Sequence, residues 1–297
     1  MSLIAVAKKD FQDSARSRWL WALTVLFVLF AGGGAYVYVG TDLLGSGPTD
    51  SDGLINLLSG SAGLLVPIIA LLAGHKAIVG ERESGSLKLL LSLPHSRAEA
   101  VFGKLLGRTV VVSGSILIGF LVATVLGVSL ADQFDAVDFL AFTGITILLA
   151  LAYVSIALGL SAATSSASRA IGLAVGFWLV FEFLWGLLAA GLLWAFNDFS
   201  LDGIVDGGVE GQYFLFTRLS PSTAYGTAVA TLSEGQSLIQ QLNVIGLFPV
   251  AGPGDSPLPG GEPVPFYLED WFALVILAVW VIVPVVLGYL RFESTDL

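Results

Sequence analysis

The sequence contains no cysteine, and it has only two histidines and one methionine among its 297 residues. Without thiols there is no disulfide, no thiolate metal site and no cysteine nucleophile. Histidine and methionine are the other side chains that soft metals prefer. Two histidines and one methionine are too few to provide a ligand cluster. We therefore expect this chain to hold no cofactor and no metal.

Charged residues are also scarce. They make up 12% of the chain, whereas hydrophobic residues make up 56%, and the mean hydropathy is +0.87. This composition is far more apolar than that of a soluble domain, and it predicts an all-α protein that crosses a membrane several times. Basic residues are fewer than acidic ones, 13 against 23. The resulting net charge of −10 disfavours a nucleic-acid partner.

Six runs are long and apolar enough to span a bilayer as helices. Pro67 and Pro284 fall inside the second and sixth runs, where each would kink its helix because proline cannot donate the backbone hydrogen bond. Gly172 and Gly176 form a GxxxG pair, typical of closely packed membrane helices, although 35 glycines make such pairs frequent by chance. The predicted spans are about 19–39, 54–74, 105–130, 139–163, 170–196 and 271–290.

Residues 1–18 are expected to form an amphipathic helix in the membrane interface, ahead of the first span. The alternative is a disordered basic tail, but apolar residues at helical spacing favour the helix. Its apolar side would carry Leu3, Ile4, Ala7, Phe11 and Ala15, with Lys8, Lys9, Gln12, Asp13 and Arg16 mostly on the other side.

The distribution of charge predicts the orientation in the membrane. With six spans, twelve of the thirteen Lys and Arg residues fall on one side, and Arg218 alone falls on the other. By the positive-inside rule the basic side is the cytoplasm, which places both termini there in a multi-pass protein of the plasma membrane. The long connection 197–270 is then external. Its segment 219–232 is open to three interpretations: a short helix, a re-entrant hairpin or a plain cap on the outer surface.

The segment 81–104 is the only charge-dense stretch between two apolar runs, and it must leave the bilayer because unpaired charges are costly in hydrocarbon. Leu87, Leu90 and Leu91 form one apolar face of a short helix that Pro94 would end. The sequence SRAE then matches a capping box that starts the next helix. A solvated loop that only fixes the topology would explain the charges but neither the apolar face nor the cap.

The start of this segment resembles a phosphate-binding loop in its glycine spacing only. Gly80 and Gly85 have the required separation, but Ser86 stands where such a loop needs lysine. The stretch is also acidic and would repel phosphate groups. We therefore expect no ATP site in this chain.

Glu182 is the one acidic residue well inside an apolar run, FWLVFEFLWG. A carboxyl group at that depth must face the interior of the bundle, and it is a functional candidate by default. Two interpretations stay open. Glu182 serves a substrate or a gate, or it is a structural carboxyl that is hydrogen-bonded to Ser, Thr or Tyr of a neighbouring helix.

The sequence ERESGSL, followed by LLxLPxSR and then by GK, closely resembles the signature of ABC-2 type transporter permeases, particularly their NosY-like members. The basic start KxDFxxxxRSRW and the external LSPSTAY add to the resemblance. Ser220 stands where the family usually has Asn, and the scarcity of Met, His and Cys gives no reason to infer copper as the cargo. The matching positions are Glu81, Arg82, Glu83, Gly85, Ser86, Leu87, Leu90, Leu91, Pro94, Arg97, Gly103 and Lys104.

The resemblance implies a permease subunit, itself no enzyme, that works with a separate ABC ATPase subunit carrying the ATP and Mg²⁺. The short helix after Glu81 would be the coupling helix docked on that ATPase. Two permease subunits would pair, as a homodimer or with a related chain, and transport would be export. Two rivals remain: a secondary transporter that uses Glu182 as its ion site, and a scaffold that passes ATPase-driven motion to an external partner through 197–270.

Overall fold

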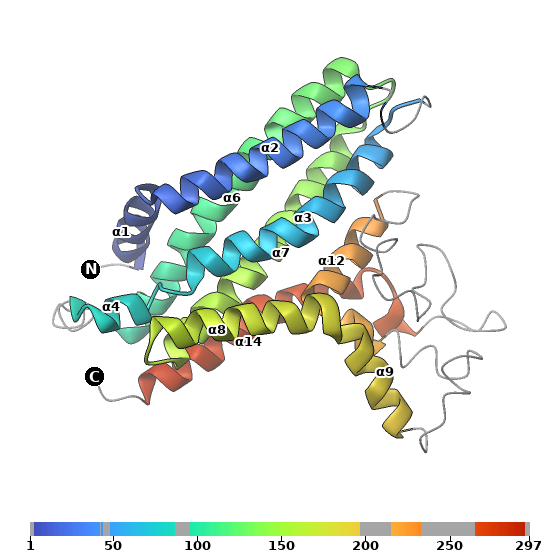
Figure 1. The fold of residues 1–297 in the computed structure, drawn as a ribbon. Coiled ribbons are helices and arrows are strands. Elements are labelled where there is room, and N and C mark those ends of the chain that lie inside the picture. Colours follow the sequence, from blue (N-terminus) through green and yellow to red (C-terminus); the bar gives the residue numbers. More distant parts are fainter. Residues whose placement is uncertain are drawn as a thin grey trace.

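The computed structural model describes residues 3–41, 43, 48–86, 96–196, 215–232 and 265–294. Every regular element in this part of the chain is a helix, and six helices are long and apolar enough to cross a membrane. The predicted all-α fold with six spans is therefore confirmed (Figure 1).

The spans are single helices or near-continuous pairs. The first three are α2 (Arg18–Gly40), α3 (Ser51–Gly74) continued by α4 (Val79–Glu83), and α6 (Arg97–Leu130). The others are α7 (Ala136–Ala163), a fifth span built from α8 (Ala167–Leu179), the π-helix η2 (Val180–Leu184) and α9 (Trp185–Phe196), and α14 (Phe272–Glu293). The shorter helices are α1 (Leu3–Ala15), α12 (Pro221–Ala230) and η3 (Phe266–Leu268).

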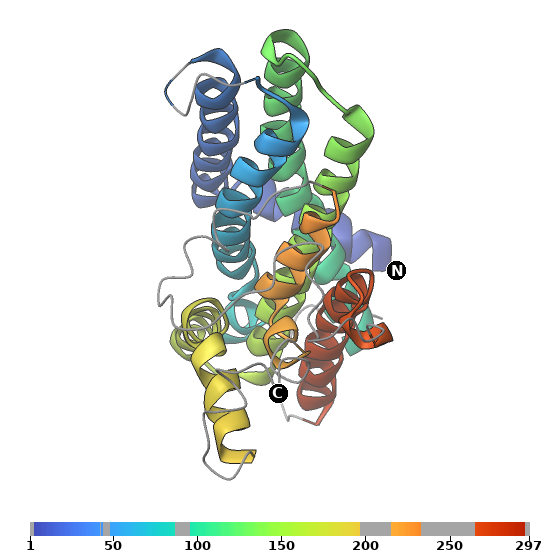
Figure 2. The ribbon, with the colours of Figure 1, turned by 90° about the vertical axis from the view of Figure 1, so that its right-hand side faces the viewer.

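The second and fourth spans form the centre of the bundle, with 67% and 61% of their apolar windows buried, against 6% for the fifth span. In Figure 2 the lower part of α7 lies behind α12 (orange), beside α14 (red). α7 and α14 approach most closely at Gly159 and Gly288, where a side chain on either residue would collide with the backbone of the other helix. Glycine at both positions is what permits this crossing, as is usual for helices packed in a membrane.

The fifth span bends at η2, where α9 turns away from the direction of α8 (Figure 1). A π-helical turn inserts extra backbone into the helix and is one of the recognised causes of such a bend. Gly172 and Gly176 lie in α8, and a Cβ atom at either would meet nothing within 4 Å. The expectation of close helix packing at this GxxxG pair is therefore wrong for the described residues.

α1, α4 and the last turn of α14 lie together at one end of the bundle (Figure 1). Of the predicted external connection, residues 197–214 and 233–264 lie outside the described residues. The segment 219–232 contains α12, which confirms a helix there. α12 packs against α7 and α14 and is inserted among the spans instead of covering them, through its buried residues Pro221, Ala224, Tyr225, Ala228 and Val229.

α1 is a helix, as expected, and its predicted place in the membrane interface stays a prediction. It packs along the first turns of α6, and the residues that face α6 are Val6, Asp10 and Ser14. Ile4 and Phe11, from the predicted apolar side, are 72% and 40% exposed. The small and ion-paired residues of α1 therefore face the protein, and its large apolar residues point away from it.

Candidate functional site

The described parts of segment 81–104 are the end of α4, the turn that follows it and the first turns of α6. The turn before α4 is fixed to α7, because the backbone N–H groups of Ile78 and Val79 both donate to the buried Ser161 hydroxyl, at 3.0 and 3.1 Å. After α4, Gly85 has a φ of +74°, a left-handed conformation that glycine adopts without strain. Gly85 thus lets the chain turn sharply at the end of α4.

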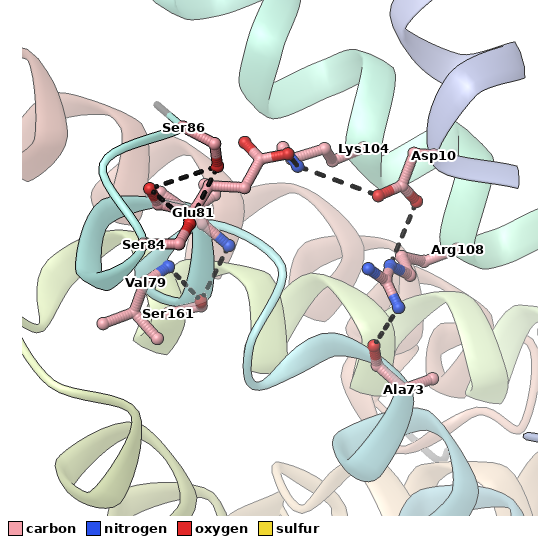
Figure 3. A network of polar contacts seen from close by, with 10 residues as sticks. Asp10, Ala73, Val79, Glu81, Ser84, Ser86, Lys104, Arg108 and Ser161 are labelled. Atoms are coloured by element: carbon pink, nitrogen blue, oxygen red, sulfur yellow. Dashed lines mark hydrogen bonds and ion pairs between the residues drawn. The ribbon is translucent and has the colours of Figure 1, made fainter. Parts of the chain in front are cut away.

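Glu81 belongs to a network of charges that joins three helices (Figure 3). Its carboxylate lies 2.8 Å from the ammonium group of Lys104 on α6. The same ammonium lies 3.8 Å from the carboxylate of Asp10 on α1, which in turn lies 3.0 Å from the guanidinium of Arg108. Arg108 also donates to the Ala73 carbonyl at the end of α3, at 2.9 Å.

The network is buried at its centre. The side chains of Lys104 and Asp10 are 4% and 5% exposed, whereas those of Glu81 and Arg108 are 22% and 19% exposed. Burial raises the pKa of the Asp10 carboxyl above its ordinary value, and the charges of Arg108 and Lys104 oppose that shift. Removing one partner from such a cluster leaves another charge without compensation, which is costly in a dry environment.

Glu83 and Arg82 contact the turn between α7 and α8. The Glu83 carboxylate accepts a hydrogen bond from the backbone N–H of Ala167, at 2.7 Å. Ala167 is the first residue of α8, and an anion at a helix N-terminus is favourable because the N–H groups there have no helical partner. The Arg82 guanidinium lies 3.5 Å from the carbonyl of Thr164.

Arg97 is bound to the end of the last span. Its guanidinium donates to the carbonyls of Phe292 and Glu293, at 2.8 and 2.7 Å, and lies 5.4 Å from the centre of the Phe292 ring. Both carbonyls belong to the last turn of α14, where a cation is favourable. The start of α6 is fixed as predicted, because Ser96 and Glu99 form both hydrogen bonds of the capping box.

The structure thus gives Glu81, Glu83 and Arg97 partners within the chain, on both flanks of residues 87–95. Leu87, Leu90, Leu91 and Pro94 lie outside the described residues, so the short apolar helix stays a prediction. Ser86 and Gly85 lie in the turn after α4, where the Ser86 hydroxyl donates to the Glu81 carbonyl at 3.4 Å.

Sequence reasoning missed Asp10 and Arg108. One signal was available: Lys104 and Arg108 are four residues apart and so share a face of α6. Gly103 and Gly107 mark the adjoining surface, because a Cβ at Gly103 would lie 2.7 Å from the Cβ of Val6, and one at Gly107 would lie 2.8 Å from an Asp10 carboxylate oxygen. Gly103 and Gly107 therefore form a GxxxG pair at which α1 and α6 come into close contact.

Glu182 lies in η2 and is hydrogen-bonded to α12. Its carboxylate accepts from the Ser222 hydroxyl at 2.6 Å, and that hydroxyl lies 2.8 Å from the Tyr153 hydroxyl of α7. Since Ser222 donates its one hydrogen to Glu182, Tyr153 donates to Ser222. These are the contacts expected of a structural carboxyl, the second of the two interpretations. A role of Glu182 in transport stays a prediction.

Among the described residues, no group of three or more His, Asp or Glu side chains is placed to bind a metal ion. The features that stand out are a bundle of six spans and a polar segment whose flanks are bound to α1, α6, α8 and α14. Residues 4–297 match the family model described as ABC-2 family transporter protein.

The chain belongs to the ABC-2 transporter family. Two curated relatives carry the name "Probable ABC transporter permease protein NosY". The protein from Pseudomonas aeruginosa is 35% identical over 193 residues, which cover 63% of this chain and 70% of the relative. The protein from Stutzerimonas stutzeri is 34% identical over 244 residues, which cover 78% of this chain and 87% of the relative. The resemblance found in the sequence is thereby confirmed, and this ABC-2 family member is a membrane subunit of an ABC transporter.

Proposed function

We propose that this ABC-2 permease couples a separate ATPase subunit to the movement of a substrate across the plasma membrane, with both termini in the cytoplasm. The observation that carries the proposal is the set of contacts on the two flanks of residues 87–95. Glu81 is tied to α6 directly and to α1 through Lys104, Glu83 is tied to α8, and Arg97 is tied to α14. A force applied between these flanks would reach four helices of the bundle through short polar contacts.

In this mechanism, ATP and Mg²⁺ are bound by the partner, and residues 87–95 are its docking element. Closure of the ATPase subunits would push on this element, and the attached helix ends would move with it as rigid bodies. Charge-assisted contacts are suited to the task because they are short and geometrically specific. This chain makes and breaks no covalent bond itself.

The proposal includes a second permease subunit, identical or related. Its support is the fifth span, of which only 6% of the apolar window is buried within the chain. A pair of membrane subunits on two ATPase subunits would form a translocation pathway between two copies of the bundle. We propose export as the direction because the sequence signature resembles that of exporters in this family.

The test is co-purification with the ABC ATPase encoded nearest to the gene. The variant Leu90→Glu/Leu91→Glu places two charges on the predicted apolar face and is expected to lose the ATPase on an affinity column. Arg169→Gln, which changes an exposed residue at the same end of the bundle, is expected to retain it. Equal retention by both variants would contradict the docking role of 87–95.

The two rival functions predict other results. A secondary transporter that uses Glu182 needs no ATPase, so failure of the wild-type chain to retain any ATPase subunit would favour it. Loss of transport in a folded Glu182→Gln variant, with ATP turnover unchanged, would also point to an essential carboxylate at η2. A scaffold acting through 197–270 predicts that a shortened external connection abolishes function while the ATPase stays bound.

A further inference from the structure

The side of α1 that faces away from the protein combines exposed apolar and basic residues. Ile4, Lys8, Phe11 and Ala15 follow one another at intervals of four, three and four residues, so they form one stripe along the helix. Ile4 is 72% exposed and Phe11 is 40% exposed, although each is large and apolar. The stripe borders the face of α1 that packs on α6.

Basic residues surround this stripe. Lys8, Lys9, Arg16 and Arg18 are all exposed, and no ion pair joins any of them to another residue in the described part of the chain. In contrast, Lys104 and Arg108, on the helix beneath α1, are both paired with carboxylates. The positive charge on the outside of α1 is therefore available to a partner.

The start of the first span continues the same surface along the chain. Trp19 is 81% exposed and Trp21 is 58% exposed, and the Trp21 indole N–H donates to the Ala15 carbonyl at 2.8 Å. This hydrogen bond spans the break between α1 and α2, which run in different directions in Figure 1. Tryptophan is enriched where the headgroups of a bilayer meet its hydrocarbon, so this break marks the level of the headgroups.

From these features we infer that α1 and the start of α2 form a binding surface for anionic phospholipid headgroups. Ile4 and Phe11 would enter the acyl boundary, and Lys8, Arg16 and Arg18 would contact phosphate groups. Lysine at the edge of an apolar stripe is suited to this because its long stem packs on hydrocarbon while its charge reaches the headgroups. A zwitterionic lipid carries a cation beside its phosphate and so has no net charge to balance these basic residues, whereas an anionic lipid does; charge complementarity therefore favours anionic lipid.

The surface is also connected to the candidate functional site. The opposite side of α1 carries Asp10, which is paired with Lys104 and Arg108 and, through Lys104, is linked to Glu81. Lipid bound outside α1 would press the helix onto α6 and would stabilise this network. The lipid-binding inference does not depend on the ATPase partner, and its test needs none.

The first experiment measures lipid retention by the purified full-length chain, supplied with equal amounts of phosphatidylglycerol and phosphatidylcholine and analysed by native mass spectrometry. Wild type should retain mainly phosphatidylglycerol. Lys8→Gln/Arg16→Gln should reduce that preference by about tenfold or more, since each basic residue near an anionic surface contributes about fivefold. The control Lys76→Gln/Arg169→Gln removes the same charge from exposed residues elsewhere and should retain the preference. No preference in wild type, or an equal loss in both variants, would overturn the inference.

A second experiment uses the absence of cysteine, which allows a fluorophore to be attached at one position. Phe11→Cys and Gln12→Cys place the label on sides of α1 that are about 100° apart. In nanodiscs that contain phosphatidylglycerol spin-labelled near the headgroup, the label at 11 should be quenched strongly and the label at 12 weakly. Equal quenching at the two positions, in chains whose circular dichroism is unchanged, would contradict the proposed orientation of α1.

Discussion

The Lys104 side chain is 4% exposed, yet its ammonium group has two carboxylates within 3.8 Å, one from α4 and one from α1. An ammonium group can be buried at acceptable cost only when it is paired and hydrogen-bonded. The pairs with Glu81 and Asp10 therefore explain why lysine is tolerated at this position. They also make Lys104 the residue through which α1 and the segment 81–104 contact each other.

We expect Lys104→Met to destabilise the chain by about 2 kcal/mol, because the substitution leaves two carboxylates facing an apolar side chain. The value is below that for a fully buried pair, since Glu81 is partly exposed and Asp10 keeps Arg108. Thermal unfolding in detergent, followed by tryptophan fluorescence, measures the loss. Lys76→Met changes an exposed lysine and should leave the midpoint nearly unchanged, so equal shifts would argue against the network.

Asp10 makes the stability depend on pH in a defined direction. Its pKa in the folded chain is raised above the ordinary value of 3.8 by burial, so the carboxyl ionises less readily in the folded chain than in the unfolded chain. The stabilising contribution is present below pH 3.8 and is lost as the pH rises through the raised pKa. We therefore expect the unfolding midpoint of wild type, relative to that of Asp10→Asn, to fall between acid and neutral pH. A difference that rises with pH would show that the ion pairs outweigh burial.

At the scale of elements, the position of α1 is determined by two glycines of α6. A Cβ at Gly103 would lie 2.7 Å from the Cβ of Val6 and 3.1 Å from the carbonyl oxygen of Leu3, and the backbone oxygen cannot move without shifting α1. Gly107 approaches Asp10 in the same way. The close contact between the two helices is what allows Asp10 to reach Lys104.

Gly103→Ala is expected to cost about 2 kcal/mol through overpacking against α1. The matched control is Gly172→Ala on α8, where a Cβ meets nothing within 4 Å. Both changes raise helix propensity by about 1 kcal/mol, so the difference between the two isolates the contact with α1. The unfolding midpoints of the two variants provide the measurement. A control that is destabilised as much as Gly103→Ala would refute the assigned packing.

At the scale of the whole molecule, the sequence was sufficient for what depends on local composition. Hydropathy gave six spans, and the motif SRAE gave a capping box that Ser96 and Glu99 form. Both features depend on residues that are close together in the sequence. A span needs about 20 consecutive apolar residues, and a capping box needs two side chains that are three residues apart. The family signature also lies within one short stretch of the sequence, residues 81–104.

Partners distant in sequence could not be predicted. Asp10 and Lys104 are far apart in the chain, and so are Arg97 and Phe292, so no periodicity relates either pair. α1 illustrates the same difficulty. The sequence placed Ile4 and Phe11 on one side of this helix, but hydrophobicity alone does not distinguish a face that meets lipid from one that meets protein. The face of α1 that packs on α6 is centred on Asp10. Burying this carboxylate would be costly without Lys104 and Arg108 of α6 beside it.

The central claim is that contacts on the flanks of 87–95 transmit ATPase motion to the bundle, and ATP turnover of the complex in nanodiscs tests it most directly. Glu81→Gln/Glu83→Gln removes the charged contacts to α6 and α8 and leaves the predicted docking face intact. We predict that this variant retains the ATPase subunit but that the ATP turnover stimulated by the permease falls about tenfold, with Arg169→Gln unchanged. Wild-type stimulation by a folded double variant would contradict the account.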